Sequence, residues 1–177
     1  MTLSPRLRKA VLTTHIASSV GWLGAVVAYL GLDVTASRSE DVQLVRAAYA
    51  AMEVIALSAL VPLALASVVI GVINALGTSW GLFRHYWVLV KLLLTLVATA
   101  VLLLKTPTIA ALADAAGTAG DPRTLPDTLA HSIGGLLVLL VITVLSVYKP
   151  RGLTRYGWRR QQSPRIREQE KRAAVAS

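Results

Sequence analysis

Four long apolar stretches, separated by shorter polar ones, dominate the pattern of the chain. They cover residues 10–32, 53–76, 86–104 and 128–148. Each is close to the ~20 residues that a helix needs to cross ~30 Å of hydrocarbon, and helices satisfy all their backbone hydrogen bonds within lipid. The pattern therefore predicts an all-α fold, a four-helix transmembrane bundle within residues 1–150.

The polar connections predict short elements at the membrane surface. Apolar residues between Val42 and Tyr49 recur at helical spacing, which favours a short amphipathic helix at the interface. Pro62 predicts a local kink in the second span. The glycines at 77–81 indicate a tight turn, and Lys105 to Pro107 are expected to end the third span. Residues 108–127 are then interpreted as a surface loop holding a short helix.

The first stretch also resembles a secretory signal, because Arg6, Arg8 and Lys9 precede it and Val34-Thr35-Ala36 would suit cleavage. A signal core has only ~7–15 apolar residues, however, and this stretch is longer. It is therefore interpreted as the first span.

The composition favours a membrane protein. Hydrophobic residues make up 55% of the 177 and charged residues only 15%, a balance outside that of soluble domains. The chain has no cysteine, which excludes disulfides, thiolate metal sites and thiol nucleophiles. Lys and Arg outnumber Asp and Glu by 18 to 9, and nine of these cations lie in the tail from Lys149 to Arg172. A cluster in this position favours anionic lipid headgroups over nucleic acid.

The distribution of Lys and Arg predicts the orientation. With four spans both termini lie on one side, and the cations of the N-terminus and of the tail at 151–177 are on that side. By the positive-inside rule, both termini are expected in the cytoplasm and the chain in the inner (plasma) membrane. Residues 151–177 are expected to form a disordered basic tail.

Lys91 is the most informative polar residue, because it lies inside an apolar span. An ammonium group at bilayer depth costs roughly 2.5–3.5 kcal/mol, so such a group usually faces the bundle interior. His15 of the first span and Lys91 both lie about five residues from the cytoplasmic end, at a depth of ~7 Å by ~1.5 Å per residue. Asn74, late in the second span, reaches the same level. The sequence thus predicts a polar layer in one leaflet.

Helical spacing groups these residues into faces. One face of the first span carries His15, Ser18, Ser19 and Trp22, and a separate ridge carries the small residues Ala17, Gly21 and Ala25. The second span presents Ser67, Gly71 and Asn74, and the third presents Trp87, Lys91, Thr95 and Thr99.

This layer has three interpretations. In the first, Lys91 extends its ammonium group to the nearby membrane surface and His15 makes a structural hydrogen bond. In the second, the layer is a cofactor site. In the third, the same groups form an ion or proton path. In the cofactor interpretation His15 is the metal ligand of a haem, while Lys91 ligates as a neutral amine or pairs with a propionate. Trp22, on the same face as His15, and Asn74, at the same depth, also belong to the predicted cofactor-binding set.

The other histidines are expected elsewhere. His131 begins the fourth span on the outer side, where Glu53 begins the second, so the two are predicted to form a separate outer pair. His15 and His131 then lie roughly 20 Å apart along the membrane normal at ~1.5 Å per residue, too far to clamp one iron. His85, beside Arg84, is interpreted as an interfacial anchor.

Several of these residues suggest a family. His15, Gly21, Trp22 and Gly24, with Lys91 in an aromatic-led span, resemble a superfamily of small bacterial multi-span proteins. It includes HemJ-type protoporphyrinogen oxidases and the membrane domain of copper-resistance D-type proteins. The segment from Ile70 to Lys91 is similar to a bacterial family of integral membrane proteins without an assigned function.

The resemblance implies haem b, with roles in haem binding and activity for His15 and, as the catalytic residue, Lys91. A copper role is disfavoured because soft ligands are few. The hypothesis is a haem-b-binding redox protein working near the cytoplasmic leaflet. The alternative is a membrane scaffold, or a small-solute or ion permease, without a cofactor. The lipid bilayer is the expected partner, and homo-oligomerisation is left open.

Overall fold

Helices make up most of the part of the chain that the structure describes, and no strand occurs there. The structure is a computed structural model and describes residues 4–76, 85–118 and 120–148, with Gly152, Thr154 and Trp158. The prediction of an all-α fold is confirmed. The predicted turn at 77–81 and nearly all of the basic tail at 151–177 lie outside the described residues.

The helices form four long segments. They are built from α1 (Pro5–Arg38), α2 (Val42–Ile55), the π-helix η1 (Ala56–Leu60), α3 (Val61–Leu76), α4 (Tyr86–Thr118), the 3-10 helix η2 (Pro122–Thr124) and α5 (Leu129–Tyr148). Because α2, η1 and α3 are continuous, the segments long and apolar enough to cross a membrane are Pro5–Arg38, Val42–Leu76, Tyr86–Thr118 and Leu129–Tyr148. This result fits the predicted small integral membrane protein.

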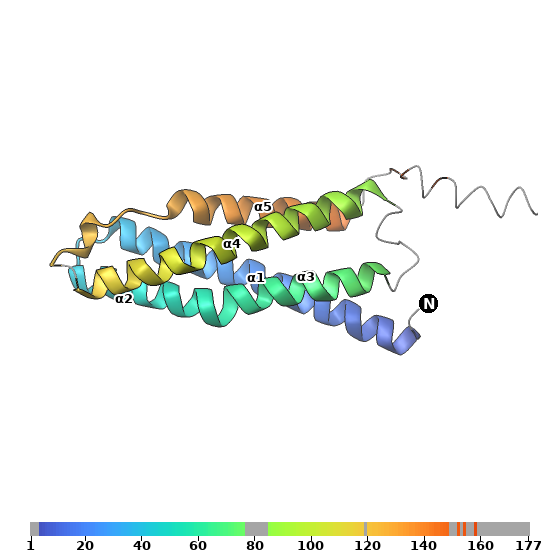
Figure 1. The fold of residues 1–177 in the computed structure, drawn as a ribbon, viewed down its shortest axis with the longest axis horizontal. Helices are drawn as coiled ribbons and strands as arrows, with labels where there is room; N and C mark the ends of the chain where they lie inside the picture. Colours follow the sequence, from blue (N-terminus) through green and yellow to red (C-terminus); the bar gives the residue numbers. More distant parts are fainter. Residues whose placement is uncertain are drawn as a thin grey trace, which may run out of the picture.

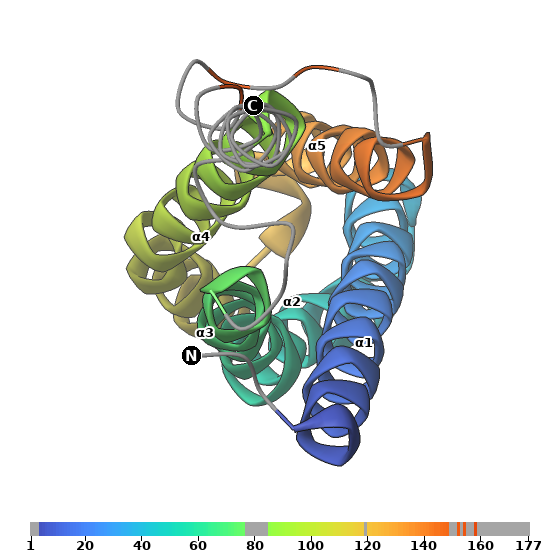
Figure 2. The same ribbon diagram turned by 90° about the vertical axis from the view of Figure 1, so that its right-hand side faces the viewer.

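Successive segments run in opposite directions along the bundle, so α1 begins and α5 ends at the same end (Figure 1). We call this the N-terminal end and the other the distal end. Helix α1 contacts α2, α3 and α5, and helix α4 contacts the same three. Seen end-on, the segments form a ring in which α1 and α4 are diagonal (Figure 2). The predicted four-helix bundle is therefore confirmed.

Three of the segments are longer than the apolar stretches. Helix α1 continues past residue 32 to Arg38, and α4 continues through Lys105 and Pro107 to Thr118. The predicted helix stop at Lys105 to Pro107 is therefore wrong. Pro107 is exposed, so the carbonyl that it leaves without an intrahelical partner can be solvated. A helix of 34 residues is ~51 Å long, which exceeds ~30 Å of hydrocarbon.

Helix α2 belongs to the bundle rather than lying on the membrane surface. Its buried face, Val45, Ala48, Tyr49 and Met52, joins the hydrophobic core. The amphipathic helix was predicted, but its position was not, because a periodic apolar face does not say whether protein or lipid covers it. The irregularity predicted at Pro62 takes the form of η1, a π-helical turn directly before it.

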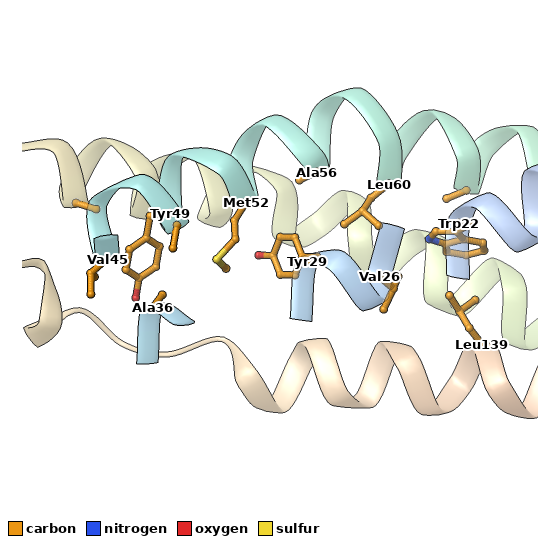
Figure 3. Packing of buried hydrophobic residues seen from close by; sticks show 13 residues of the cluster. Trp22, Val26, Tyr29, Ala36, Val45, Tyr49, Met52, Ala56, Leu60 and Leu139 are labelled. Carbon is orange, nitrogen blue, oxygen red and sulfur yellow. The ribbon is translucent and has the colours of Figure 1, made fainter. Parts of the chain in front are cut away.

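The core is a narrow seam of side chains from facing helices. Figure 3 shows Trp22, Val26 and Tyr29 of α1 meeting Leu60, Met52 and Tyr49 of the α2–α3 segment. Among the described residues, the exposed large hydrophobic side chains lie within 7–34, 54–76, 86–104 and 133–148, apart from Leu44 and Trp158. The outer surface of the bundle is thus as apolar as lipid contact requires.

Polar contacts tie the distal end together. Arg46 of α2 donates to the carbonyls of Gly117 (3.1 Å) and Gly120 (3.4 Å) at the end of α4. Arg123 bridges Asp121 (2.8 Å) and Glu40 (3.0 Å). These bonds bring the α1–α2 and α4–α5 connections to the same place, where α5 begins.

Candidate functional site

His15 lies on α1 and faces α3. A Cβ placed on Gly71 would lie 3.0 Å from its Cε1 and 3.5 Å from its Nδ1, so a side chain at position 71 would press on the imidazole, which lies close to the α3 backbone. The Ser67 backbone hydrogen-bonds the imidazole. Nδ1 is buried and has no hydrogen-bond partner. The ring is therefore held from one side, and one buried nitrogen is not used.

Serines of α1 and α3 form hydrogen bonds next to His15. The hydroxyls of Ser19 on α1 and Ser67 on α3 are 2.7 Å apart, and Ser18 donates to the carbonyl of His15 over 3.0 Å. One helical turn further, a Cβ on Gly21 would lie 3.4 Å from a methyl group of Leu63 on α3. The predicted polar face and small-residue ridge of the first span thus both meet α3, which brings His15, Ser67 and Gly71 together.

Lys91 lies on α4 and turns toward α5. Its Nζ donates to the hydroxyl of Ser146 over 3.2 Å and lies 5.8 Å from the centroid of the Trp87 ring. Both contacts suit an ammonium group. Thr95 donates to the carbonyl of Lys91 over 2.7 Å and Thr99 to that of Thr95 over 2.8 Å, so these hydroxyls are satisfied within their own helix. Ser146 was not predicted as a partner, although it occupies the last turns of the fourth span.

His15 and Lys91 influence each other electrostatically from different helices. The positive charge of Lys91 is close enough to influence the imidazole of His15, and both residues lie at the N-terminal end. Their helices are diagonal in the bundle (Figure 2), so His15 rests on α3 while Lys91 bonds α5. The layer therefore contains two basic groups whose printed contacts reach different neighbouring helices, α3 for His15 and α5 for Lys91.

Trp22 and Asn74 differ in their burial. Trp22 is 4% exposed and lies opposite Leu139 in the core (Figure 3), on the same face of α1 as His15. Asn74 is half-buried, one turn beyond Gly71 on α3. Trp22 closes the layer toward the centre of the bundle, and Asn74 borders it toward the N-terminal end.

No bond joins His131 and Glu53, the predicted outer pair, in the described structure. His131 is exposed and Glu53 is half-buried, and no hydrogen bond or ion pair joins them in the described structure. His85 is half-buried at the start of α4, with its ring centroid 6.4 Å from that of Trp87. Its predicted role as an interfacial anchor stays a prediction.

Comparisons of the chain with protein-family models, curated proteins and solved structures found no match. The chemistry of the layer is therefore argued from its own residues. In the described ranges no three His, Cys, Asp or Glu side chains lie together as a metal-binding group.

Sequence reasoning missed a second buried polar group, Asp33. It was assigned to a connection, but it lies on α1 and is 1% exposed. Its Oδ2 accepts hydrogen bonds from Thr128 (2.9 Å) and from Ser132 at the start of α5. A signal was present, because the face that carries His15, Ser18 and Trp22 reaches Tyr29 and Asp33 at helical spacing.

Outside the spans, the pKa of the Asp121 carboxyl group is perturbed. Hydrogen bonds from Arg123 lower the pKa of the exposed Asp121 to about 2, and the pKa of Arg123 is raised in turn. Both groups belong to the connection at the distal end, far along the bundle from His15. They stabilise the connection and are not part of the candidate site.

Proposed function

We propose that this chain is a small membrane protein that binds haem b through His15 and serves in redox chemistry near one membrane face. The observation that carries the proposal is the buried, unpartnered Nδ1 of His15. Imidazoles that ligate metals usually direct their other nitrogen to a carboxylate or backbone carbonyl, which fixes the ring. The contact with the Ser67 backbone supplies that arrangement.

The residues around His15 fit a haem by their chemistry. Haem iron takes a neutral imidazole, and the haem supplies the redox couple. Lys91 adds a positive charge at the same end of the bundle, suited to pairing with a propionate. Because its ammonium group already contacts Ser146 and Trp87, we favour this role over that of an axial amine. Trp22 excludes water from the inner side of the layer.

A cofactor-free scaffold is the second candidate, and one observation favours it. The imidazole fills the space that glycine leaves on α3, with Cε1 3.0 Å from a Cβ placed on Gly71. Small residues that allow close helix approach are a common means of packing membrane helices. In this function His15 locks α1 to α3 and no cofactor is bound.

The optical spectrum of the purified full-length chain separates the two functions. Protein from cells supplied with haem should show a Soret band, and His15→Ala should lose it because the axial ligand is gone. His85→Ala is the matched control, since it removes a histidine from the same end of the bundle and should leave the band unchanged. Lys91→Gln should weaken haem retention, whereas Lys105→Gln, at an exposed position, should not. A colourless wild-type protein would leave only the scaffold.

The orientation and surface partners belong to the same proposal. Both α1 and α5 have their free ends at the N-terminal end of the bundle (Figure 1), and the distribution of Lys and Arg favours the cytoplasm of the inner membrane for that end. The basic tail then meets anionic headgroups, each cation contributing ~1 kcal/mol. Fusing a reporter that is active only in the cytoplasm to Ser177 tests this orientation, and an inactive reporter would contradict it.

A further inference from the structure

The π-helical turn η1 interrupts the α2–α3 segment between the distal end and the His15 layer. The N–H of Val61 donates to the carbonyl of Ala56, five residues back, where an α-helix bonds four residues back. A turn of this kind takes up one more residue than an α-helical turn. Pro62 follows directly and has no N–H, so the regular ladder would lack a bond at this point in any case. The extra residue is thus accommodated where the helix is already irregular.

The buried residues of this segment show what the extra residue does. They are Val45, Ala48, Tyr49 and Met52 of α2, Ala56 and Leu60 of η1, and Ala64 and Ser67 of α3. In an uninterrupted α-helix, which turns by about 100° per residue, the buried residues from Leu60 to Ser67 would lie on average roughly 90° away from Met52. With one residue taken out of the count, they lie within about 40° of it. The π-turn therefore keeps the buried faces of α2 and α3 on one side of the segment.

That side faces α1. Both α2 and α3 contact α1, and Figure 3 shows Met52 and Leu60 reaching toward side chains of that helix. Further along, the hydroxyl of Ser67 lies 2.7 Å from that of Ser19 on α1, and Gly71 lies against the imidazole of His15. Without the extra residue in η1, Gly71 would be turned about 100° away from this side. The contacts of His15 with α3 thus depend on η1.

Helix α1 provides the comparison within the same bundle. Its buried residues are Ser18, Trp22, Val26, Tyr29, Asp33 and Ala36. Steps of three and four alternate among them, so they stay within about 80° of one another at about 100° per residue, and α1 is α-helical from Pro5 to Arg38. In the α2–α3 segment three steps of four follow one another from Met52 to Ala64. The π-turn occurs where the buried face would otherwise drift around the helix.

We propose that η1 is a positioning element, which sets α3 in the register that places Ser67 and Gly71 against His15. Its use in holding a haem ligand rests on the proposed function, whereas the register does not. One residue of η1 is dispensable in this role, because a segment that is shorter by one residue forms a continuous α-helix with α3 in the same register. A residue added at the same place is not tolerated, because it turns α3 by about 100°.

Disulfide cross-linking of the full-length protein tests the register. The chain has no cysteine, so the parent variant, Ser19→Cys with Ser67→Cys, holds a single pair where the two hydroxyls are 2.7 Å apart. Mild oxidation should join the pair, since the sulfur atoms can approach to the ~2.05 Å of a disulfide. Deleting Leu57, which is exposed, should leave the yield close to that of the parent. Inserting one alanine between Leu57 and Ser58 is the matched control and should lower the yield at least several-fold.

A second cross-link distinguishes a turned helix from a misfolded one. After the insertion, Ala66 takes the place of Ser67, and Ile70 takes that of Gly71 against His15. The insertion variant that carries Ser19→Cys, Ala66→Cys and Ile70→Gly should therefore cross-link as the parent does. This gain requires a folded bundle in which α3 is turned by one residue.

Loss of the cross-link between positions 19 and 67 on deleting Leu57 would overturn the proposal, because the shortened segment must fold in the native register. A parental yield through position 67 in the insertion variant would overturn it as well. So would a parent variant that does not cross-link, since Ser19 and Ser67 would then not be in contact. None of these outcomes depends on the Soret band: a colourless protein would end the proposed function and leave the expected cross-links unchanged.

Discussion

The two polar regions of this bundle differ in a way that its hydrophobic pattern does not reveal. The N-terminal layer places His15 and Lys91 inside apolar stretches, yet both side chains are only half-buried. The distal site places Asp33 just beyond an apolar stretch, yet that side chain is 1% exposed. Protein packing, and not the surrounding sequence, thus decides how deeply a polar group is buried.

The difference follows from what covers each group. Near His15, α1 is close to its own beginning, and the imidazole lies against Gly71 of α3. Near Asp33, α1 packs between α2 and the start of α5, which contribute Tyr49, Thr128 and Ser132. The first arrangement leaves the buried Nδ1 of His15 without a hydrogen-bond partner. In the second arrangement, Oδ2 of Asp33 accepts hydrogen bonds from the hydroxyls of Thr128 and Ser132.

The largest expected loss of stability is at Asp33. Asp33→Ala leaves the Thr128 and Ser132 hydroxyls without their acceptor in a buried place, which should lower the free energy of unfolding by roughly 2–4 kcal/mol. Asp114→Ala, at an exposed position on α4, should have little effect. Thermal unfolding in one detergent, followed by circular dichroism, compares the two. Equal midpoints would mean that Asp33 is not held as described.

A substitution at Gly71 tests the other region. Gly71→Leu puts side-chain atoms where the imidazole of His15 lies, since even a Cβ would be 3.0 Å from Cε1. Overpacking of this kind costs about 1–3 kcal/mol, and it should also displace His15. Gly24→Leu is the matched control, because nothing lies within 4 Å of a Cβ at that position. If both variants unfold at the same temperature, the close approach of α1 and α3 is absent.

The smallest effect is expected at Asp121. Arg123 lowers its pKa from 3.8 to about 2, so the pair stabilises the folded chain fully above pH 3.8 and loses this contribution as the pH falls through about 2. Both groups are exposed, and solvent therefore keeps the contribution small. An NMR titration of the Asp121 carboxyl should give a midpoint near 2, rising toward the ordinary value in Arg123→Gln. An identical midpoint in both proteins would exclude the ion pair.

Much of the fold followed from apolar periodicity, because lipid demands long helices. The number of segments, the inward face of α1 and its ridge against α3 were all accessible in this way. The lengths of α1 and α4 could not be predicted from the apolar pattern, because helices that pack on each other can continue beyond the ends of their apolar stretches. The helix was wrongly predicted to end at Pro107, because a proline inside a helix can kink it without ending it.

The candidate site could be predicted only in part from the sequence. Depth and spacing placed His15, Ser67 and Gly71 in one layer, since helical rise is regular. The bond from Lys91 to Ser146 depends on which helices are neighbours in the ring, and spacing along one helix carries no such information. Asp33 was missed because the first helix was taken to end at residue 32. Extending the predicted helix by one residue would have placed Asp33 on its inward face, and therefore in the core.

The separate roles of the two regions can be tested in one optical experiment on His15→Gly protein. Without the imidazole side chain the Soret band should be absent, and free imidazole in the buffer should restore it by occupying the vacated position. Asp33→Asn should retain the wild-type band, because the distal site holds no part of the haem. A Soret band in His15→Gly that equals the wild type without added imidazole would contradict the assignment of the ligand, and its loss in folded Asp33→Asn would contradict the separation of the two sites.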